Sequence, residues 1–372
     1  MRDGVGPAPY GVGPAPTITP QTPEPDPLAG RPDDAIVVTV IDDGGSAFSL
    51  QVGAISTGGI VRPIARLGAI RPAGWNEASP AWYGPPVVGP PGYLAIGVER
   101  NGGNDEADDD HERTLIYDLR DPGRAPIELG SIFYHLAFGP DGSLAAFGAE
   151  VVRIIDPATG LEQRLPTPDD VVLDTAWLAD GSGFLATRYD LNSGEPTPGA
   201  FLFSGEFVPG RAAAWAPTGR ERLVGAGGGT LGLAVSDGPF GSESAIIESR
   251  PDRPAGGVVW ASYTEPGDDA RFDEAVWDAA GTGIWLTRTS RDNRRSWLSH
   301  MTTPLTDTRV ATLPRPGWMI AGLSADDAWA VLSSDADHQL MLVDASTGGS
   351  RILASGPDRA PVFAGWLSTL QG

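Results

Sequence analysis

Short apolar runs separated by turn-forming residues recur along most of this chain. In the segment LAFGPDGSLAAFG (136–148), the tetrapeptide GPDG (139–142) stands between two such runs. Proline at its second position, aspartate at its third and glycine at its fourth are typical of a type I turn. The runs on either side, 134–138 and 144–147, are short, apolar and rich in aromatic residues. The pattern therefore predicts two antiparallel strands joined by a tight turn.

The same pattern recurs with a bulky residue before the turn, at the place that Phe138 takes in this hairpin. The equivalent anchor residues are Trp82, Trp177, Trp215, Trp277 and Leu323. The residue before each anchor is small or β-branched: Ala81, Ala137, Ala176, Ala214, Val276 and Gly322. Successive residues of a strand face opposite sides of the sheet, so the bulky anchor lies on one side and the residue before it on the other. Because that preceding residue is small or β-branched, we expect its side of the sheet to be crowded. Strands that converge on a central axis would create such a place.

Further apolar runs complete four strands in several of the units. A third run ends in aspartate and a turn in TLIYDLRDPG (114–123), VVRIIDPATG (151–160) and LMLVDASTGG (340–349). LEQRL (161–165) and SRILAS (350–355) then supply a fourth run. Four strands in a unit of about 40 residues are typical of a β-propeller blade.

The segment LAFGPDGSLAAFGAEVVRIIDPATGLEQRL (136–165) resembles a blade of the TolB-like and WD-repeat β-propellers. The TolB-type repeat runs W-S-P-D-G, then an I-A-F strand, then an I-Y-x-x-D strand that ends in a T-G turn. The similarity extends over residues 70–356, and the GH dipeptide of true WD-repeats is missing. In the family, the aromatic residue of the first strand packs between adjacent blades, which the resemblance implies for the anchors here.

The two ends of the chain complement each other. Residues 35–42, 47–55 and 59–67 read as three strands without a leading anchor strand. The C-terminal run APVFAGWLSTL (360–370) carries only that first strand, with the small-then-aromatic pair at 365–366. Joining them makes one composite blade and removes exposed sheet edges. With six internal blades, the sequence predicts an all-β, seven-bladed β-propeller of four-stranded blades.

Residues 1–33 differ from the propeller predicted for residues 34–372. GVGPAP occurs twice in this segment, and prolines recur after it. Proline lacks an N–H and cannot continue a helix or a strand ladder, so an extended, flexible Pro-rich spacer is expected. The spacer is either a stalk that holds the propeller away from a membrane or wall, or an end without a role.

The charge of the chain restricts its partners. The sequence holds 48 acidic and 26 basic residues, all of the latter arginine, which gives a formal net charge of −22. Such a field repels nucleic acid and anionic lipid, so neither nucleic-acid binding nor direct membrane insertion is expected. Because cysteine is absent, disulfides and thiolate metal sites are excluded.

Familiar catalytic motifs are missing from the sequence. G-x-S-x-G, H-E-x-x-H and the Ser-x-Asp-x-Gly-x-Thr-Trp box of sialidases do not occur. The glycine-rich GAGGGTLG (225–232) lacks the G-K-[ST] ending of a phosphate loop and is interpreted as a strand turn. No catalytic residue and no cofactor is therefore predicted.

An acidic loop between two predicted strands is a candidate Ca²⁺ site. The segment NGGNDEADDDHE (101–112) contains Asp105, Glu106, Asp108, Asp109, Asp110 and Glu112. Carboxylate oxygens at this density suit Ca²⁺, although the spacing is not that of an EF-hand. The alternative is a solvated acidic loop without a metal.

An arginine-rich segment is a candidate contact for an anion or an acidic partner. TRTSRDNRRSW (287–297) carries Arg288, Arg291, Arg294 and Arg295. Guanidinium groups bind carboxylates through paired hydrogen bonds, which would suit this role. The alternative is a solvated hairpin arm.

A third candidate site follows from the repeat register. The residues three positions before the anchors are Ser79, His135, Asp174, Ala212, Glu274, Ile320 and, before Trp366, Phe363. If their strand face looks into the channel, His135, Asp174 and Glu274 meet near its axis. Two carboxylates and an imidazole could bind a cation or a sugar, or serve acid–base chemistry. The alternative is that they only hydrate the channel.

The preferred interpretation is a non-enzymatic, extracytoplasmic or cell-surface binding, scaffold or sensor propeller. Its expected partner is another protein or a cell-envelope component. The alternative is an enzyme, a hydrolase or a lyase, with its site at the channel.

Overall fold

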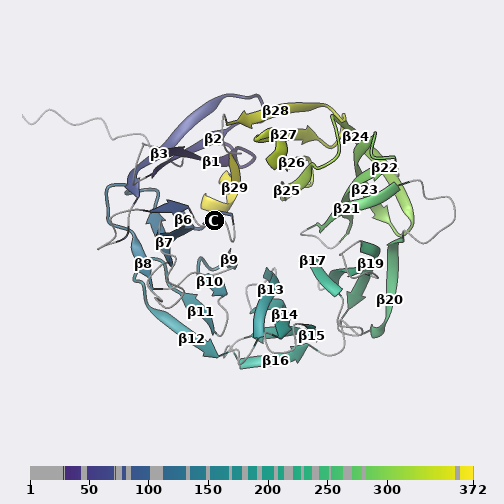
Figure 1. The fold of residues 1–372 in the computed structure, drawn as a ribbon, viewed down its shortest axis with the longest axis horizontal. Coiled ribbons are helices and arrows are strands. Elements are labelled where there is room, and N and C mark those ends of the chain that lie inside the picture. Colours follow the sequence, from purple (N-terminus) through teal and green to yellow (C-terminus); the bar gives the residue numbers. More distant parts are fainter. Residues whose placement is uncertain are drawn as a thin grey trace, which may run out of the picture.

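The described strands form seven antiparallel sheets arranged around a ring, and the fold is a β-propeller (Figure 1). The structure is a computed structural model. It describes residues 28, 30–42, 48–70, 72, 78–80, 85–100, 112–130, 135–147, 151–166, 170–177, 183–190, 195–204, 208–212, 221–227, 230–236, 243–250, 253–262, 270–278, 282–290, 292–356 and 361–371. Over 165–273 it describes the backbone of the strands and, of the side chains, that of Trp260.

The sheet that closes the ring combines both ends of the described chain. Its strands, in the order β29-β1-β2-β3, are β1 (Ala35–Asp42), β2 (Phe48–Ile55), β3 (Val61–Ile70) and β29 (Val362–Trp366). Strand β29 pairs antiparallel with β1, and Ala35 lies opposite Trp366. The predicted composite blade is confirmed. The run predicted as one C-terminal strand ends at Trp366, because the short helix α1 (Leu367–Gln371) follows it directly.

The next sheet has an innermost strand in two pieces, which both pair with β6. Its strands are β4 (Ser79–Pro80), β5 (Val87–Gly89), β6 (Tyr93–Glu99), β7 (Glu112–Asp118) and β8 (Ile127–Leu129). Two sheets of four consecutive strands follow. They consist of β9 (His135–Phe138), β10 (Leu144–Phe147), β11 (Val151–Ile155) and β12 (Glu162–Pro166), then β13 (Asp170–Trp177), β14 (Gly183–Asp190), β15 (Glu195–Ser204) and β16 (Val208–Ala212).

The remaining three sheets repeat this four-strand order. They consist of β17 (Glu221–Gly227), β18 (Thr230–Ser236), β19 (Glu243–Arg250) and β20 (Arg253–Ser262); β21 (Ala270–Trp277), β22 (Ile284–Ser290), β23 (Ser296–Thr303) and β24 (Thr306–Leu313); and β25 (Met319–Leu323), β26 (Trp329–Ser334), β27 (Gln339–Asp344) and β28 (Ser350–Ser355). A 3-10 turn, η1 (Asp335–Asp337), precedes β27. Among the described residues, no helix is long and apolar enough to cross a membrane.

The β9–β10 hairpin has the turn that its sequence predicts. The Gly142 N–H donates to the Gly139 carbonyl (3.0 Å), and Gly142 has a φ of 84°. Asp141 Oδ1 accepts from the N–H (3.0 Å) and the hydroxyl (2.7 Å) of Ser143. The left-handed backbone at its fourth position explains why glycine stands there.

The corresponding hairpin of the second sheet turns later than the sequence predicts. The Gly92 N–H donates to the Gly89 carbonyl at 3.0 Å, which is the same bond as in the β9–β10 turn. Val88 precedes Gly89 and therefore takes the place of Phe138. The prediction that Trp82 takes this place is wrong, and Trp82 itself lies outside the described residues.

The position before an anchor is crowded, as the small residues there predict. A Cβ on Gly322 would collide with the ring of Phe363 in the neighbouring sheet. A Cβ on Gly365 would lie 2.6 Å from Val88 Cγ2. Neighbouring sheets therefore approach so closely at these innermost strands that a side chain larger than glycine would have to displace its neighbour.

The core lies between neighbouring sheets. Trp277 is 4 % exposed and packs with Trp260 of the preceding sheet, whereas Val276 packs against the cluster shared with the following sheet. Leu28, inside the predicted spacer, is also buried, in the cluster shared by the composite sheet and the β4–β8 sheet. Both faces of an innermost strand are thus covered by apolar side chains of adjacent sheets.

Candidate functional site

The candidate residues of the acidic loop lie almost entirely outside the described residues. Asp105, Glu106, Asp108, Asp109 and Asp110 belong to the segment 101–111. Glu112 is the first residue of β7, is half-buried and pairs in register with Glu99. In the part of the chain that the structure describes, no group of three or more His, Cys, Asp or Glu residues could hold a metal ion. The Ca²⁺ site stays a prediction.

Of the three described arginines of the predicted patch, one is buried and two are exposed. The Arg288 side chain is 8 % exposed and its Nη1 lies 3.2 Å from Asp307 Oδ2, so it forms an ion pair inside the sheet. Arg294 and Arg295 are exposed in the β22–β23 turn, with Arg294 Nε 3.8 Å from Asp292 Oδ2. Arg291 lies outside the described residues. An anion contact on this hairpin would therefore rest on the turn, without Arg288.

Of the three channel candidates, Glu274 has the best-defined environment. Its Oε2 accepts a hydrogen bond from the Ile320 N–H at 2.8 Å, and thereby joins β21 to β25 of the next sheet. His135 is half-buried at the start of β9, and burial lowers the pKa of its imidazole. Asp174 lies in β13, where its side chain is not described. The meeting of all three at the channel axis stays a prediction.

We expect Glu274→Ala to lower the free energy of unfolding by about 1–2 kcal/mol, because it leaves the amide of the buried Ile320 without this acceptor. Glu274→Gln keeps an oxygen at the acceptor position and should lose less. Urea unfolding followed by circular dichroism measures both changes. Equal losses for the two variants would mean that the hydrogen bond to the next sheet contributes nothing.

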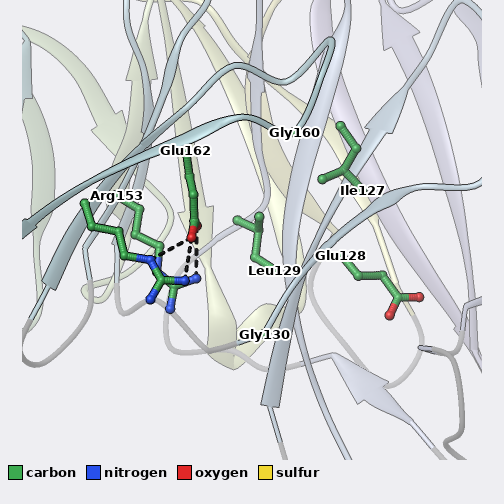
Figure 2. Close-up of a pocket in the computed structure, with 8 residues that line it drawn as sticks. Ile127, Glu128, Leu129, Gly130, Arg153, Gly160 and Glu162 are labelled. Atoms are coloured by element: carbon green, nitrogen blue, oxygen red, sulfur yellow. Dashed lines mark hydrogen bonds and ion pairs between the residues drawn. The ribbon is translucent and has the colours of Figure 1, made fainter.

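A groove lies between the outer strands of two neighbouring sheets (Figure 2). It encloses about 330 Å³ between the second and third sheets. Its lining comes from β8 and the β11–β12 hairpin: Ile127, Glu128, Leu129, Gly130, Arg153, Gly160, Glu162 and Arg164. The sequence does not predict this groove, because neither the β7–β8 nor the β11–β12 hairpin carries a recognisable binding motif.

The β11–β12 turn sets the width of this groove. The Gly160 N–H donates to the Asp156 carbonyl (2.8 Å), and the Thr159 hydroxyl donates to Asp156 Oδ2 (2.7 Å). Gly160 has a φ of 73°, and a Cβ there would lie 3.3 Å from Ile127 Cγ2. The left-handed backbone and the close approach of β8 both favour glycine at this position.

One side of the groove is charged and the other apolar. Figure 2 shows Arg153 joined to Glu162, with Ile127 and Leu129 facing them and the Glu128 carboxylate turned away. Arg153 Nη1 lies 3.2 Å from Glu162 Oε2, and both side chains are largely covered.

A second arginine holds the same carboxylate at the rim of the groove. Arg164 Nε donates to Glu162 Oε1 at 2.7 Å. Burial alone would raise the pKa of Glu162, but the hydrogen bonds and charges of Arg164 and Arg153 outweigh it, so the pKa is lowered. The carboxylate therefore stays ionised in mildly acidic solution. The Arg164 side chain is 63 % exposed, and its guanidinium can also contact a bound ligand.

No protein-family model matches the sequence, and the search of curated proteins finds no relative. Solved structures do resemble the fold. An oligogalacturonate lyase from Vibrio parahaemolyticus is 9 % identical, with a TM-score of 0.56 and 87 % of each chain covered. An oligogalacturonate lyase in complex with manganese is 11 % identical, with a TM-score of 0.51, and the match covers 86 % of this chain and 85 % of the other.

A putative TolB from Agrobacterium tumefaciens is 14 % identical, with a TM-score of 0.47, and the match covers 65 % of this chain and 85 % of the other. At such low identities, the likeness of the two lyases supports the β-propeller fold and assigns no activity.

Proposed function

We propose that this chain is a non-enzymatic, extracytoplasmic binding propeller that holds a short segment of a partner protein in the groove between β8 and β12. The observation that carries the proposal is the groove itself, in which an exposed guanidinium, that of Arg164, stands opposite the apolar wall of Ile127 and Leu129. An apolar side chain can cover that wall while an adjacent carboxylate meets the arginine. Glu162 already holds the guanidinium in place, which reduces the ordering cost of binding.

The charge of the chain favours a partner that is basic overall. A protein with a net charge of −22 attracts cationic surfaces at long range and repels acidic ones. Inside the groove, however, the local arginines favour a carboxylate. The proposed partner is therefore a basic protein of the cell envelope that presents one apolar–acidic segment, with the predicted N-terminal spacer acting as a tether.

A displayed library of short peptides tests the groove directly. Selection on the wild-type chain is expected to enrich peptides with an acidic residue next to an apolar one. Arg164→Gln should weaken their binding about tenfold, because one charge-assisted hydrogen bond contributes about 1.5 kcal/mol. Arg294→Gln is the matched control, since it removes the same charge from a side chain that is 84 % exposed on another sheet. Equal binding by the wild-type chain and the Arg164 variant would contradict the proposal.

The enzyme alternative is a lyase with its site at the channel, and it has a separate test. Two oligogalacturonate lyases share the fold over most of this chain, one of them described in complex with manganese. Incubation with oligogalacturonate and Mn²⁺ would give an ultraviolet-absorbing double bond if the chain eliminates across the glycosidic linkage. We expect no such product. A product that is lost in His135→Ala would favour the lyase over the binding module.

A further inference from the structure

The outer rim of the ring consists of sheet edges, because the last strand of each sheet pairs with one described strand only (Figure 1). These outermost strands are β3, β8, β12, β16, β20, β24 and β28. An unpaired edge presents a row of backbone N–H and C=O groups, to which another extended chain can add. Proteins usually protect such edges with bulges, prolines or very short strands. An edge without these features is therefore open to an added strand.

Among the described outermost strands, all but β12 have one of these protections. The ladders that join β3, β20, β24 and β28 to their neighbours contain register shifts. Strand β8 has only three residues, and β16 contains Pro209. The five residues of β12 pair with β11 without a shift, and the proline of β12, Pro166, is its last residue. Strand β12 is thus a regular edge, and it borders the groove.

The hydrogen bonds of the β11–β12 hairpin show which backbone groups β12 leaves open. The Asp156 N–H donates to the Leu161 carbonyl at 2.9 Å, and Ile155 lies opposite Glu162 in the ladder. In an antiparallel ladder, pairs that exchange hydrogen bonds alternate with pairs that do not. The pair of Ile155 and Glu162 is therefore of the second kind, and so is the pair of Arg164. The N–H and C=O groups of Glu162 and Arg164 thus point away from β11, towards the free edge.

The side chains of the same two residues face the groove. Glu162 and Arg164 are two positions apart in one strand, so their side chains share a face of the sheet, and both line the groove. An extended segment that pairs with this edge would have every second side chain on that face. These side chains would lie beside the Arg164 guanidinium and opposite the apolar wall of Ile127 and Leu129. The edge and the groove therefore form one surface for an extended chain.

The charges along this edge favour an acidic segment over a second copy of the chain. The guanidinium groups of Arg153 and Arg164 both contact the single carboxylate of Glu162, and the Arg164 side chain is still 63 % exposed. A carboxylate on an added strand can therefore contact Arg164 from its open side. Two copies of the whole chain repel each other, because each has a net charge of −22.

We propose that the partner segment adds to β12 as a fifth strand of the sheet β9–β12, with its backbone bonded to Glu162 and Arg164 and every second side chain in the groove. This inference rests on the proposed binding function and gives the conformation of the bound segment. Side chains that lie next to one another on one face of a strand are two residues apart in its sequence. The acidic and the apolar residue of the segment are therefore separated by one residue.

Peptides methylated at single backbone nitrogens test this edge on the full chain. The probe is a capped, fluorescently labelled peptide of the sequence Thr-Val-Thr-Asp-Thr-Leu-Thr, and fluorescence anisotropy measures its affinity. An added strand bonds to its neighbour through every second amide, whereas the amides between them point away. Methylation of every second nitrogen should therefore weaken binding about tenfold for each lost hydrogen bond. Methylation of the nitrogens between them should leave the affinity nearly unchanged.

Hydrogen exchange tests the same contact from the side of the chain. With the probe bound, the amides of Glu162 and Arg164 should exchange about tenfold more slowly, because they acquire an acceptor. The amide of Gln163 already bonds to β11 in the alternating ladder and should change little. Binding through side chains alone would not produce this difference between neighbouring amides of β12.

The variant Arg164→Gln separates this inference from the proposed function. It should weaken binding of the probe about tenfold and keep the alternating effect of methylation. Binding that Arg164→Gln weakens, without the alternation, would overturn the added strand and leave the groove as the binding site. Alternation that is unaffected by Arg164→Gln would instead contradict the proposed function. A probe that does not bind, or slow exchange of the Glu162 and Arg164 amides in a dimer of the chain without the probe, would also overturn the added strand.

Discussion

A chain that ends at residue 356 is expected to lose its cooperative unfolding transition. The deletion removes β29, whose ladder with β1 closes the ring, and it removes the helix α1. Phe363 and Trp366 pack in one cluster with Val331 and Leu342 of the preceding sheet, so their loss opens the core on two sheets at once. The remaining sheet has three strands, and its edge strand β1 is then unpaired, which also favours aggregation. Circular dichroism and fluorescence in a urea titration would show a broad or absent transition.

The control deletion removes residues 1–27 and keeps Leu28, which is 5 % exposed in the core. This shortened chain should unfold at the same urea concentration as the full chain. An unchanged urea midpoint for the C-terminal deletion would contradict this prediction. It would mean that the pairing of β29 with β1 contributes no stability to the ring.

Elements that depend on residues close together in the chain could be predicted from the sequence. The strand β1 matches its predicted range of residues 35–42, and GPDG forms the predicted tight turn between two antiparallel strands. The composite sheet was also predictable, because one terminus lacked the strand that the other supplied. These features depend on alternation and turn chemistry within a few residues, which a single sequence contains.

The register of the second sheet could not be predicted, because two turn signals compete there. Pro-Pro pairs stand at 85–86 and 90–91, and a tryptophan before the first resembles the other anchors. The structure uses the second pair, and Val88 fills the anchor position against the composite sheet. The choice depends on which residue fits between sheets, and this contact is not local.

The candidate sites were less predictable than the fold for a similar reason. Arg288 belongs to a basic run in the sequence, but both faces of β22 are covered in the folded ring, and Asp307 pairs with its guanidinium there.

The largest effect of a single substitution is expected at Trp277, the anchor of β21. Its side chain is 4 % exposed, and its ring meets that of Trp260 edge to face with centroids 5.1 Å apart. Trp277→Ala removes a large apolar group from the contact between two sheets, and should lower the free energy of unfolding by about 3–5 kcal/mol. The indole N–H of Trp277 is buried and has no hydrogen-bond partner among the described residues. Trp277→Phe should therefore cost less than about 2 kcal/mol, since it loses volume but no hydrogen bond.

Trp297 of the same sheet provides the comparison for this prediction. It is only half-buried, and the Arg309 guanidinium lies over its ring at 5.3 Å. Trp297→Ala should cost roughly 1 kcal/mol, because solvent already reaches the ring and the cation–π contact is weak at an exposed site. In urea titrations of the three variants, Trp277→Ala is expected to show the largest loss in the free energy of unfolding, and Trp277→Phe and Trp297→Ala smaller losses. If Trp277→Ala cost no more than Trp297→Ala, the anchor would not lie between the sheets, and the repeat register built on Phe138 would fail at its best-defined position.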